Sequence, residues 1–138
     1  MANAPVDWET LATAAGVARA RAYAPYSGFA VGAAVLFEDG AVVAGANVEN
    51  ASYGLGVCAE RTAVAAGVLG GHGRLRAVLV LAQSPRPVPP CGACRQVLVE
   101  FGDADVPVQS RTVSGVQTTR TLGALLPEAF GPEWLGPG

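Results

Sequence analysis

Lysine is absent from the 138 residues of this chain, and all nine basic residues are arginine. Without a lysine amine, the protein cannot form a Schiff base with pyridoxal phosphate or with a carbonyl substrate. The P-loop that holds nucleotide phosphates also requires a lysine. Schiff-base catalysis by a lysine and nucleotide binding by a P-loop are therefore excluded.

Charge is also scarce. Charged residues make up 14% of the chain, the formal net charge is -2 and the sequence pI is about 5.3. This balance gives no electrostatic attraction to a polyanion, so nucleic acid and anionic membranes are not expected partners. Hydrophobic residues reach 51%, which excludes disorder and indicates that self-association buries part of the surface. The length fits a single domain spanning residues 1–138.

Long hydrophobic runs are missing as well. The longest apolar stretches, such as Phe29 to Phe37, reach about half of a membrane span, and residues 1–9 do not form a basic start followed by an apolar core. We therefore expect a cytoplasmic protein. Its three cysteines are an odd number, which favours reduced thiols over a disulfide framework.

The hydrophobic pattern alternates between helical and extended segments. An Asp-Gly turn at Asp39-Gly40 joins two extended runs and predicts a hairpin. Strands interleaved with helices indicate a layered α/β domain with a mixed sheet. The predicted helices are 7–23, 58–69, 91–101 and 122–126, and the predicted strands are 31–37, 41–46, 76–82, 106–110 and 116–119.

The cysteines lie at two predicted helix starts. Cys91 and Cys94 are separated by two residues, so both sulfurs face one point at the first turn of a helix, where the helix dipole favours thiolate. Cys58 begins another helix and reaches the same point if the two N-termini pack together. Three ligands leave one tetrahedral position free, which is the arrangement of a catalytic zinc that binds water.

Two other interpretations of the cysteines stay open. They could be buried free thiols that pack like small hydrophobic residues. They could also form a closed structural zinc site with His72 as the fourth ligand. This second alternative requires His72 to reach across about 18–20 Å of helix, so a solvated turn residue is the better interpretation of His72.

Charged residues surround the predicted metal position. Glu60 follows Cys58 by two positions and is the natural candidate to move a proton between bound water and substrate. Three thiolates carry more negative charge than zinc carries positive charge, and a cation near sulfur offsets that excess. Arg61 and Arg95 each directly follow the cluster, and either could donate to a thiolate or pair with a surface carboxylate.

Longer motifs make the pattern specific. They resemble the short, homotetrameric, zinc-dependent form of cytidine deaminase in order along nearly the whole chain. The matching segments are Tyr23 to Phe29 (YAPYSGF), Asn47 to Gly54 (NVENASYG), Cys58 to Ala63 (CAERTA), Pro90 to Val97 (PCGACRQV) and Leu125 to Pro127 (LLP).

The resemblance implies a three-layer α/β/α sandwich around a mixed five-stranded sheet. It also implies hydrolysis of cytidine and deoxycytidine to uridine and deoxyuridine with release of ammonia, an activity of pyrimidine salvage. Zinc is placed on Cys58, Cys91 and Cys94, and Glu60 exchanges protons between the bound water, the ring N3 and the leaving amine. Arg61 matches the arginine that donates to a cysteine sulfur in relatives with three cysteine ligands.

The resemblance further implies the substrate contacts. The Ala59 backbone N–H would hold the pyrimidine carbonyl. Asn47 and Glu49, which leave the same face of a strand end, would hold the ribose 3′-hydroxyl. Phe29 and Tyr53 would wall the base and sugar. The loop from Ala51 to Tyr53 and the C-terminal Phe130 would reach a neighbouring subunit's pocket.

Three alternative functions remain. The first is deamination of a cytosine nucleoside antibiotic of the blasticidin type, whose enzymes share the Cys-Ala-Glu and Pro-Cys-Gly-x-Cys-Arg elements. The second is a zinc-stabilised binding module without turnover, which needs a closed metal site and has no use for Glu60. The third, editing of cytidine within RNA or DNA, requires a basic channel that the charge balance does not supply.

Overall fold

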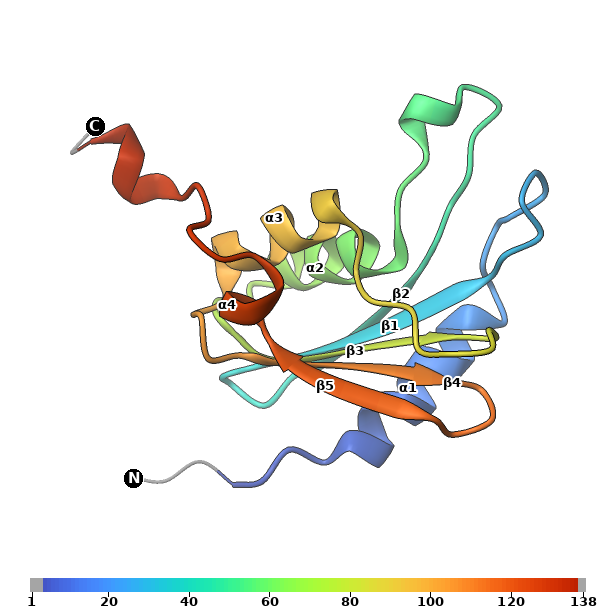
Figure 1. Cartoon of the computed structure of the whole chain (residues 1–138), viewed down its shortest axis with the longest axis horizontal. Coiled ribbons are helices and arrows are strands. Elements are labelled where there is room, and N and C mark those ends of the chain that lie inside the picture. Colours follow the sequence, from blue (N-terminus) through green and yellow to red (C-terminus); the bar gives the residue numbers. More distant parts are fainter. Residues whose placement is uncertain (1–3, 137–138) are drawn as a thin grey trace.

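The computed structural model describes residues 4–136, which form one five-stranded sheet flanked by helices (Figure 1). Its strands are β1 (Val31–Phe37), β2 (Val42–Ala46), β3 (Leu75–Ala82), β4 (Pro107–Thr112) and β5 (Gln117–Thr121). Its α-helices are α1 (Trp8–Arg19), α2 (Ala59–Leu69), α3 (Gly92–Phe101) and α4 (Leu122–Leu125). None of the helices in residues 4–136 combines the length and the apolar character that a membrane span requires.

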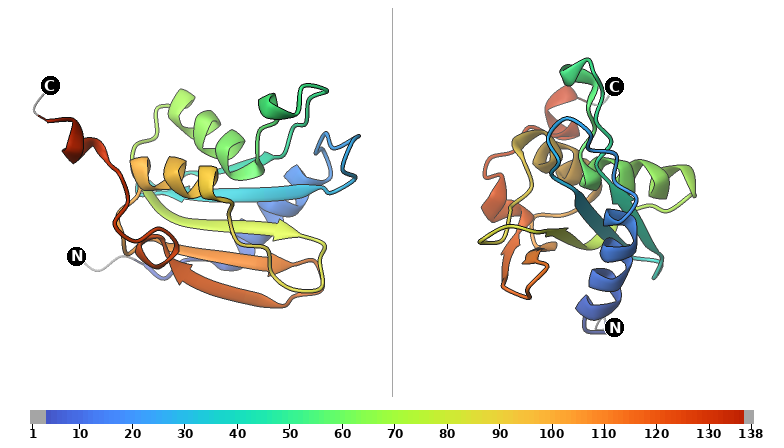
Figure 2. Two further views of the ribbon diagram at one scale, coloured as in Figure 1. Left: turned by 45° about the horizontal axis from the view of Figure 1, so that its top comes forward. Right: turned by 90° about the vertical axis from the view of Figure 1, so that its right-hand side faces the viewer.

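The sheet lies between two helical layers, as Figure 2 shows, so the predicted three-layer α/β/α arrangement is confirmed. Strand β1 alternates its side chains between the two faces. Ala34 and Leu36 pack with helix α1, whereas Val35 and Phe37 pack in the larger core under α2 and α3. Because both faces are covered, β1 and the 77–82 part of β3 are apolar.

The strand order is β2-β1-β3-β4-β5, and the sheet is mixed as predicted. Strands β3 and β4 are parallel and the other neighbours are antiparallel. Since β1 runs opposite to both β2 and β3, strands β2 and β3 point in the same direction. Their carboxyl ends therefore lie at one edge of the sheet. Helices α2 and α3 follow these two strands along the chain, which brings both helix N-termini to that edge.

Several segments differ from the sequence-based expectation. Helix α1 ends at Arg19, four residues before the predicted end at Tyr23. The Tyr23 N–H donates to the Asn47 carbonyl at 3.0 Å, and the Glu49 N–H donates to the Tyr23 carbonyl at 2.8 Å. This pairing holds the chain in an extended conformation that a helix cannot adopt. A 3₁₀ turn over Pro132–Leu135 was also not predicted.

Close approach of α2 to the sheet depends on a glycine in β2. A Cβ at Gly45 would overlap the Thr62 hydroxyl and the Ala63 backbone nitrogen. The Thr62 hydroxyl also donates to the Ala46 carbonyl at 2.9 Å, which ties α2 to β2. The first turn of α2 is thus held against the strand by contacts that leave no space for a methyl group.

We expect Gly45→Ala to lower the free energy of unfolding by about 2 kcal/mol, because overpacking forces α2 away from the strand. Urea denaturation checks this value. Gly73→Ala is the matched control, since a Cβ at Gly73 meets no atom within 4 Å. Equal stability of the two variants would contradict the close packing described here.

Candidate metal centre

Two cysteines occupy the N-cap positions of neighbouring helices. Cys58 caps α2 and Cys91 caps α3, both with extended backbone, and Cys94 lies in the first turn of α3. The sequence predicted cysteines at these two helix starts. Because both helix N-termini lie at the same edge of the sheet, the three sulfur atoms come within 4.8 Å of one another.

The sulfur separations fit a tetrahedral metal site. The distance between sulfurs is 3.7 Å for Cys58 and Cys91 and 3.5 Å for Cys91 and Cys94. Zinc–sulfur bonds of about 2.3 Å at tetrahedral angles place two thiolates about 3.8 Å apart. The three cysteines are free of disulfides. Their spacing therefore suits a zinc ion with three thiolate ligands and one open position.

His72 takes no part in this cluster. It lies beyond the opposite end of α2, and its Nδ1 atom is 2.6 Å from the Asp39 carboxylate. Its ring also packs beside Phe37, with the ring centroids 5.3 Å apart. His72 thus has local partners far from the sulfurs, which removes the closed site that used it as the fourth ligand.

The thiols of Cys58 and Cys94 do not ionise equally. Hydrogen bonding from Cys94 is the largest cause that lowers the pKa of Cys58 to about 5, with further contributions from Cys91 and Arg61. The same hydrogen bond and burial raise the pKa of Cys94. Cys58 thus releases its proton before Cys94. A metal ion that binds all three sulfurs must displace the proton of the most buried thiol, Cys94.

Glu60 lies in the first turn of α2, two residues after Cys58. It is buried, with 4% of its surface exposed. Burial is the main cause that raises the pKa of the Glu60 carboxyl, and the nearby Cys58 charge raises it further. A carboxyl group with a raised pKa can both accept and return a proton near neutral pH. This chemistry matches the role that the sequence predicted.

The two arginines next to the cluster have different partners. The Arg61 Nη2 atom donates to the Gly56 carbonyl at 3.2 Å, and its guanidinium helps to lower the Cys58 pKa. Its Nε atom is buried and has no hydrogen-bond partner among residues 4–136. Arg95 instead donates to the carbonyls of Pro90 at 2.7 Å and Leu125 at 2.8 Å. Arg61 is therefore the cation beside sulfur, and Arg95 joins the Cys91 loop to α4.

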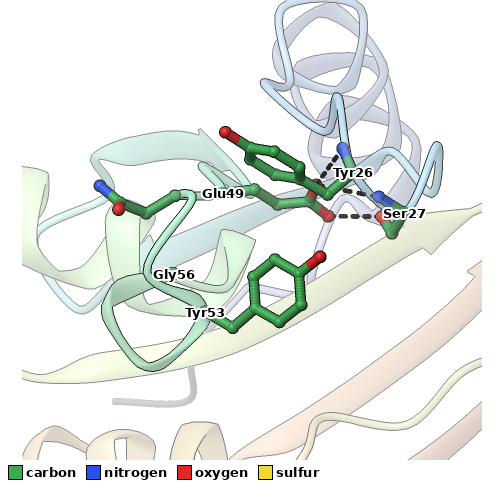
Figure 3. Close-up of a pocket in the computed structure, with 6 residues that line it drawn as sticks. Tyr26, Ser27, Glu49, Tyr53 and Gly56 are labelled. Carbon is green, nitrogen blue, oxygen red and sulfur yellow. Dashed lines mark hydrogen bonds between the residues drawn. The ribbon is translucent and has the colours of Figure 1, made fainter.

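Asn47 and Glu49 follow strand β2 and face the segment before β1. The Asn47 amide accepts from the Val31 N–H at 2.9 Å and donates to the Phe29 carbonyl at 2.8 Å. Glu49 accepts from the backbone N–H groups of Tyr26 at 3.0 Å and Ser27 at 3.1 Å (Figure 3). These bonds fix both polar side chains just after the end of β2.

A cavity of about 370 Å³ adjoins these polar groups. Tyr26 and Tyr53 face each other across it, with ring centroids 5.8 Å apart (Figure 3). Tyr53 and Glu49 were predicted from the sequence as site residues, whereas Tyr26 and Ser27 were not, although both belong to the YAPYSGF segment. The cavity is lined by Tyr26, Ser27, Glu49, Asn50, Tyr53 and Gly56.

Four predicted contact residues are exposed in the single chain, whereas Ala59 is buried at the start of α2. Phe29 is 39%, Tyr53 78% and Phe130 57% exposed, and Ala51 is exposed as well. The Phe130 carbonyl accepts from the Gln96 side chain at 2.8 Å. The structure therefore does not bring Phe130 and Tyr53 into one enclosed pocket within a single chain.

Comparison with known proteins identifies the family. Residues 6–110 match the family model described as the cytidine and deoxycytidylate deaminase zinc-binding region. The chain belongs to this deaminase family. The match covers Cys58, Cys91 and Cys94, so the prediction of an enzyme with a zinc cofactor is confirmed.

Related cytidine deaminases are similar over most of their length. The Halalkalibacterium halodurans protein is 49% identical over 93% of this chain and 97% of its own. The Mycobacterium tuberculosis protein is 48% identical over 91% of each chain. The cytidine deaminase crystal structure from Burkholderia pseudomallei superposes with a TM-score of 0.87 at 45% identity, and covers 91% of this chain and 100% of that one. The predicted deaminase fold is confirmed.

In this deaminase, Arg61→Ala tests how the arginine acts on the metal centre. We expect the variant to keep most of its zinc and to lose about tenfold in kcat, because three thiolates without a neighbouring cation weaken the Lewis acidity of zinc. Metal analysis and turnover at saturating cytidine check the two effects separately. Unchanged turnover at saturation would reject this charge-tuning role.

Proposed function

We propose that one domain spanning residues 1–138 hydrolyses cytidine and deoxycytidine to uridine and deoxyuridine with release of ammonia. The observation that carries this proposal is the buried Glu60 carboxyl, 4% exposed, beside three converging cysteine sulfurs. The relatives named cytidine deaminase support the same activity. In the reaction, one water replaces the amino group at C4 of the cytosine ring.

Glu60 moves the protons of this reaction. Cys58, Cys91 and Cys94 would hold the zinc ion, which would supply Lewis acidity and make water more acidic at the open position. Glu60 takes a proton from the attacking water and passes it to N3 of the ring. It then takes the second proton of the water and delivers it to the amino group, which leaves as ammonia. A single carboxyl suffices because it alternates between base and acid.

Backbone and polar groups would hold the nucleoside. Ala59 is the first residue of α2, so its N–H has no intrahelical partner and is available to the pyrimidine carbonyl. Asn47 and Glu49 would bind the ribose 3′-hydroxyl, the first as a donor and the second as an acceptor. Phe29 would pack beside the base. All these groups lie near the edge of the sheet where α2 begins.

A homotetramer with shared active sites would complete the pocket. Tyr53 and Phe130 are 78% and 57% exposed in the single chain, and the 51–53 loop projects away from the body (Figure 1). Contact with a neighbouring subunit would bury these aromatic rings beside its substrate. The three free thiols require a reducing compartment, which supports the cytoplasm as the location.

Ammonia release from a panel of cytosine compounds tests the proposal. We expect release from cytidine and deoxycytidine but not from free cytosine or cytidine monophosphate. Release from a blasticidin-type nucleoside alone would favour the antibiotic alternative. Tight binding of cytidine by the zinc-containing protein without any turnover would favour the binding module.

A further inference from the structure

Ser27 joins two groups that the proposed function assigns to the substrate. Its hydroxyl donates to the Oε2 atom of Glu49 and accepts the Phe29 N–H at 3.0 Å. Ser27 lies in the turn between α1 and β1, whereas Glu49 follows β2 (Figure 3). One hydroxyl thus connects the proposed sugar-binding carboxylate with the backbone of the proposed base-packing residue.

The hydrogen bonds of Glu49 leave little of its carboxylate free. A carboxylate has about four acceptor positions, two on each oxygen. Oε1 accepts the backbone N–H groups of Tyr26 and Ser27, at 3.0 and 3.1 Å. Oε2 accepts the Ser27 hydroxyl. One acceptor position therefore remains, and it lies on the oxygen that Ser27 orients. The Ser27 hydrogen bond is also the largest cause that lowers the pKa of Glu49.

The Phe29 backbone is held from both sides. Its N–H donates to the Ser27 hydroxyl, and its carbonyl accepts from the Asn47 amide at 2.8 Å. Gly28, which lies between Ser27 and Phe29, has a φ of 68°, a left-handed conformation that only glycine adopts at low cost. Among residues 4–136, one amide hydrogen of Asn47 donates to Phe29 and the other has no partner. One donor and one acceptor thus remain for a single sugar hydroxyl.

We infer that Ser27 is a positioning residue that makes the site selective for nucleosides carrying a 3′-hydroxyl. The inference rests on the proposed contact between Glu49 and that hydroxyl. Ser27 does not touch the substrate. It orients the single free acceptor position of Oε2 toward the sugar, so that the 3′-hydroxyl donates to a charged acceptor.

The test compares nucleosides that differ at the 3′ position. We expect Ser27→Ala to raise KM about tenfold for cytidine and for 2′-deoxycytidine, with little change in kcat. The variant should leave KM for 2′,3′-dideoxycytidine unchanged, because this nucleoside has no hydroxyl to offer. Ser27→Thr keeps the hydroxyl and should restore the KM for cytidine. Ser114→Ala, at the turn between β4 and β5, is the matched control and should behave as the wild type.

A double variant separates positioning from general loss of structure. If Ser27 acts through Glu49, Ser27→Ala should add no further rise in KM for cytidine when Glu49 is already alanine. Additive effects, or an equal loss on dideoxycytidine, would overturn the inference. Should Ser27→Ala fail to fold, Ser27→Cys keeps the shape with a weaker donor and supports the same comparison.

A binding measurement separates this inference from the proposed reaction. Wild-type protein that does not turn over cytidine would contradict the proposed function. Calorimetry with uridine and 2′,3′-dideoxyuridine still decides the role of Ser27, because it requires no turnover. The inference is supported if Ser27→Ala binds uridine more weakly than the wild type does but binds 2′,3′-dideoxyuridine equally well. Equal affinities of wild type and variant for uridine overturn it.

Discussion

Replacing Glu60 with glutamine is expected to lower kcat for cytidine by about 10³- to 10⁴-fold while zinc stays bound. Glutamine keeps the size of the side chain but cannot accept and return a proton, and positioned acid–base groups contribute about 10²- to 10⁴-fold. Glu60 is not among the three sulfur ligands, so zinc content per chain should equal that of the wild type. Turnover and metal analysis on the same sample check both effects.

The control for this variant is a glutamate in another helix. Glu100 is exposed on α3, and Glu100→Gln removes the same charge away from the sulfurs. We expect this control to keep wild-type turnover. A Glu60→Gln variant that keeps zinc and retains more than about a tenth of the wild-type kcat would rule out the assigned proton transfer.

Loss of one thiolate is the second change with a large expected effect. Cys94 is fully buried, and its sulfur is 3.5 Å from that of Cys91. Cys94→Ala leaves two ligands, too few to hold zinc at an open site. We expect less than about a tenth of a zinc ion per chain and no measurable deamination.

Reconstitution separates metal loss from misfolding. Wild-type protein stripped with a chelator should lose its activity and recover it when zinc is added. The Cys94→Ala variant should remain inactive under the same addition, while its circular dichroism shows the helices still formed. An active Cys94→Ala variant without bound metal would show that the three-cysteine centre is not required for the reaction.

Local features of the sequence predict most of the fold. The starts of α2 and α3 follow from apolar spacing after a loop, and the turn at Asp39-Gly40 sets the β1–β2 hairpin. The meeting of the three cysteines was expected only on the condition that the two helix N-termini pack together. The strand order supplies this condition, because β2 and β3 run in the same direction and bring the following helices to one edge. The helix starts and the hairpin depend on neighbours in the chain, whereas the cysteine cluster also depends on the order and direction of the strands.

Features that depend on distant partners could not be predicted in this way. Helix α1 ends early because Tyr23 pairs with the backbone around Asn47, which lies 24 residues later. The partners of Arg95, the carbonyls of Pro90 and Leu125, depend on where the C-terminal segment packs. The bond from Ser27 to Glu49 likewise requires the folded turn. No local pattern specifies such contacts.

Ammonia and uridine production from cytidine by the zinc-containing protein is the most direct test of deamination by zinc and Glu60. The measurement follows both products in one reaction, with chelated protein and the Glu60→Gln variant beside it. The wild type should produce equal amounts of uridine and ammonia, and the other two samples should produce neither. Wild-type protein with one zinc per chain that produces neither product would contradict the proposed reaction.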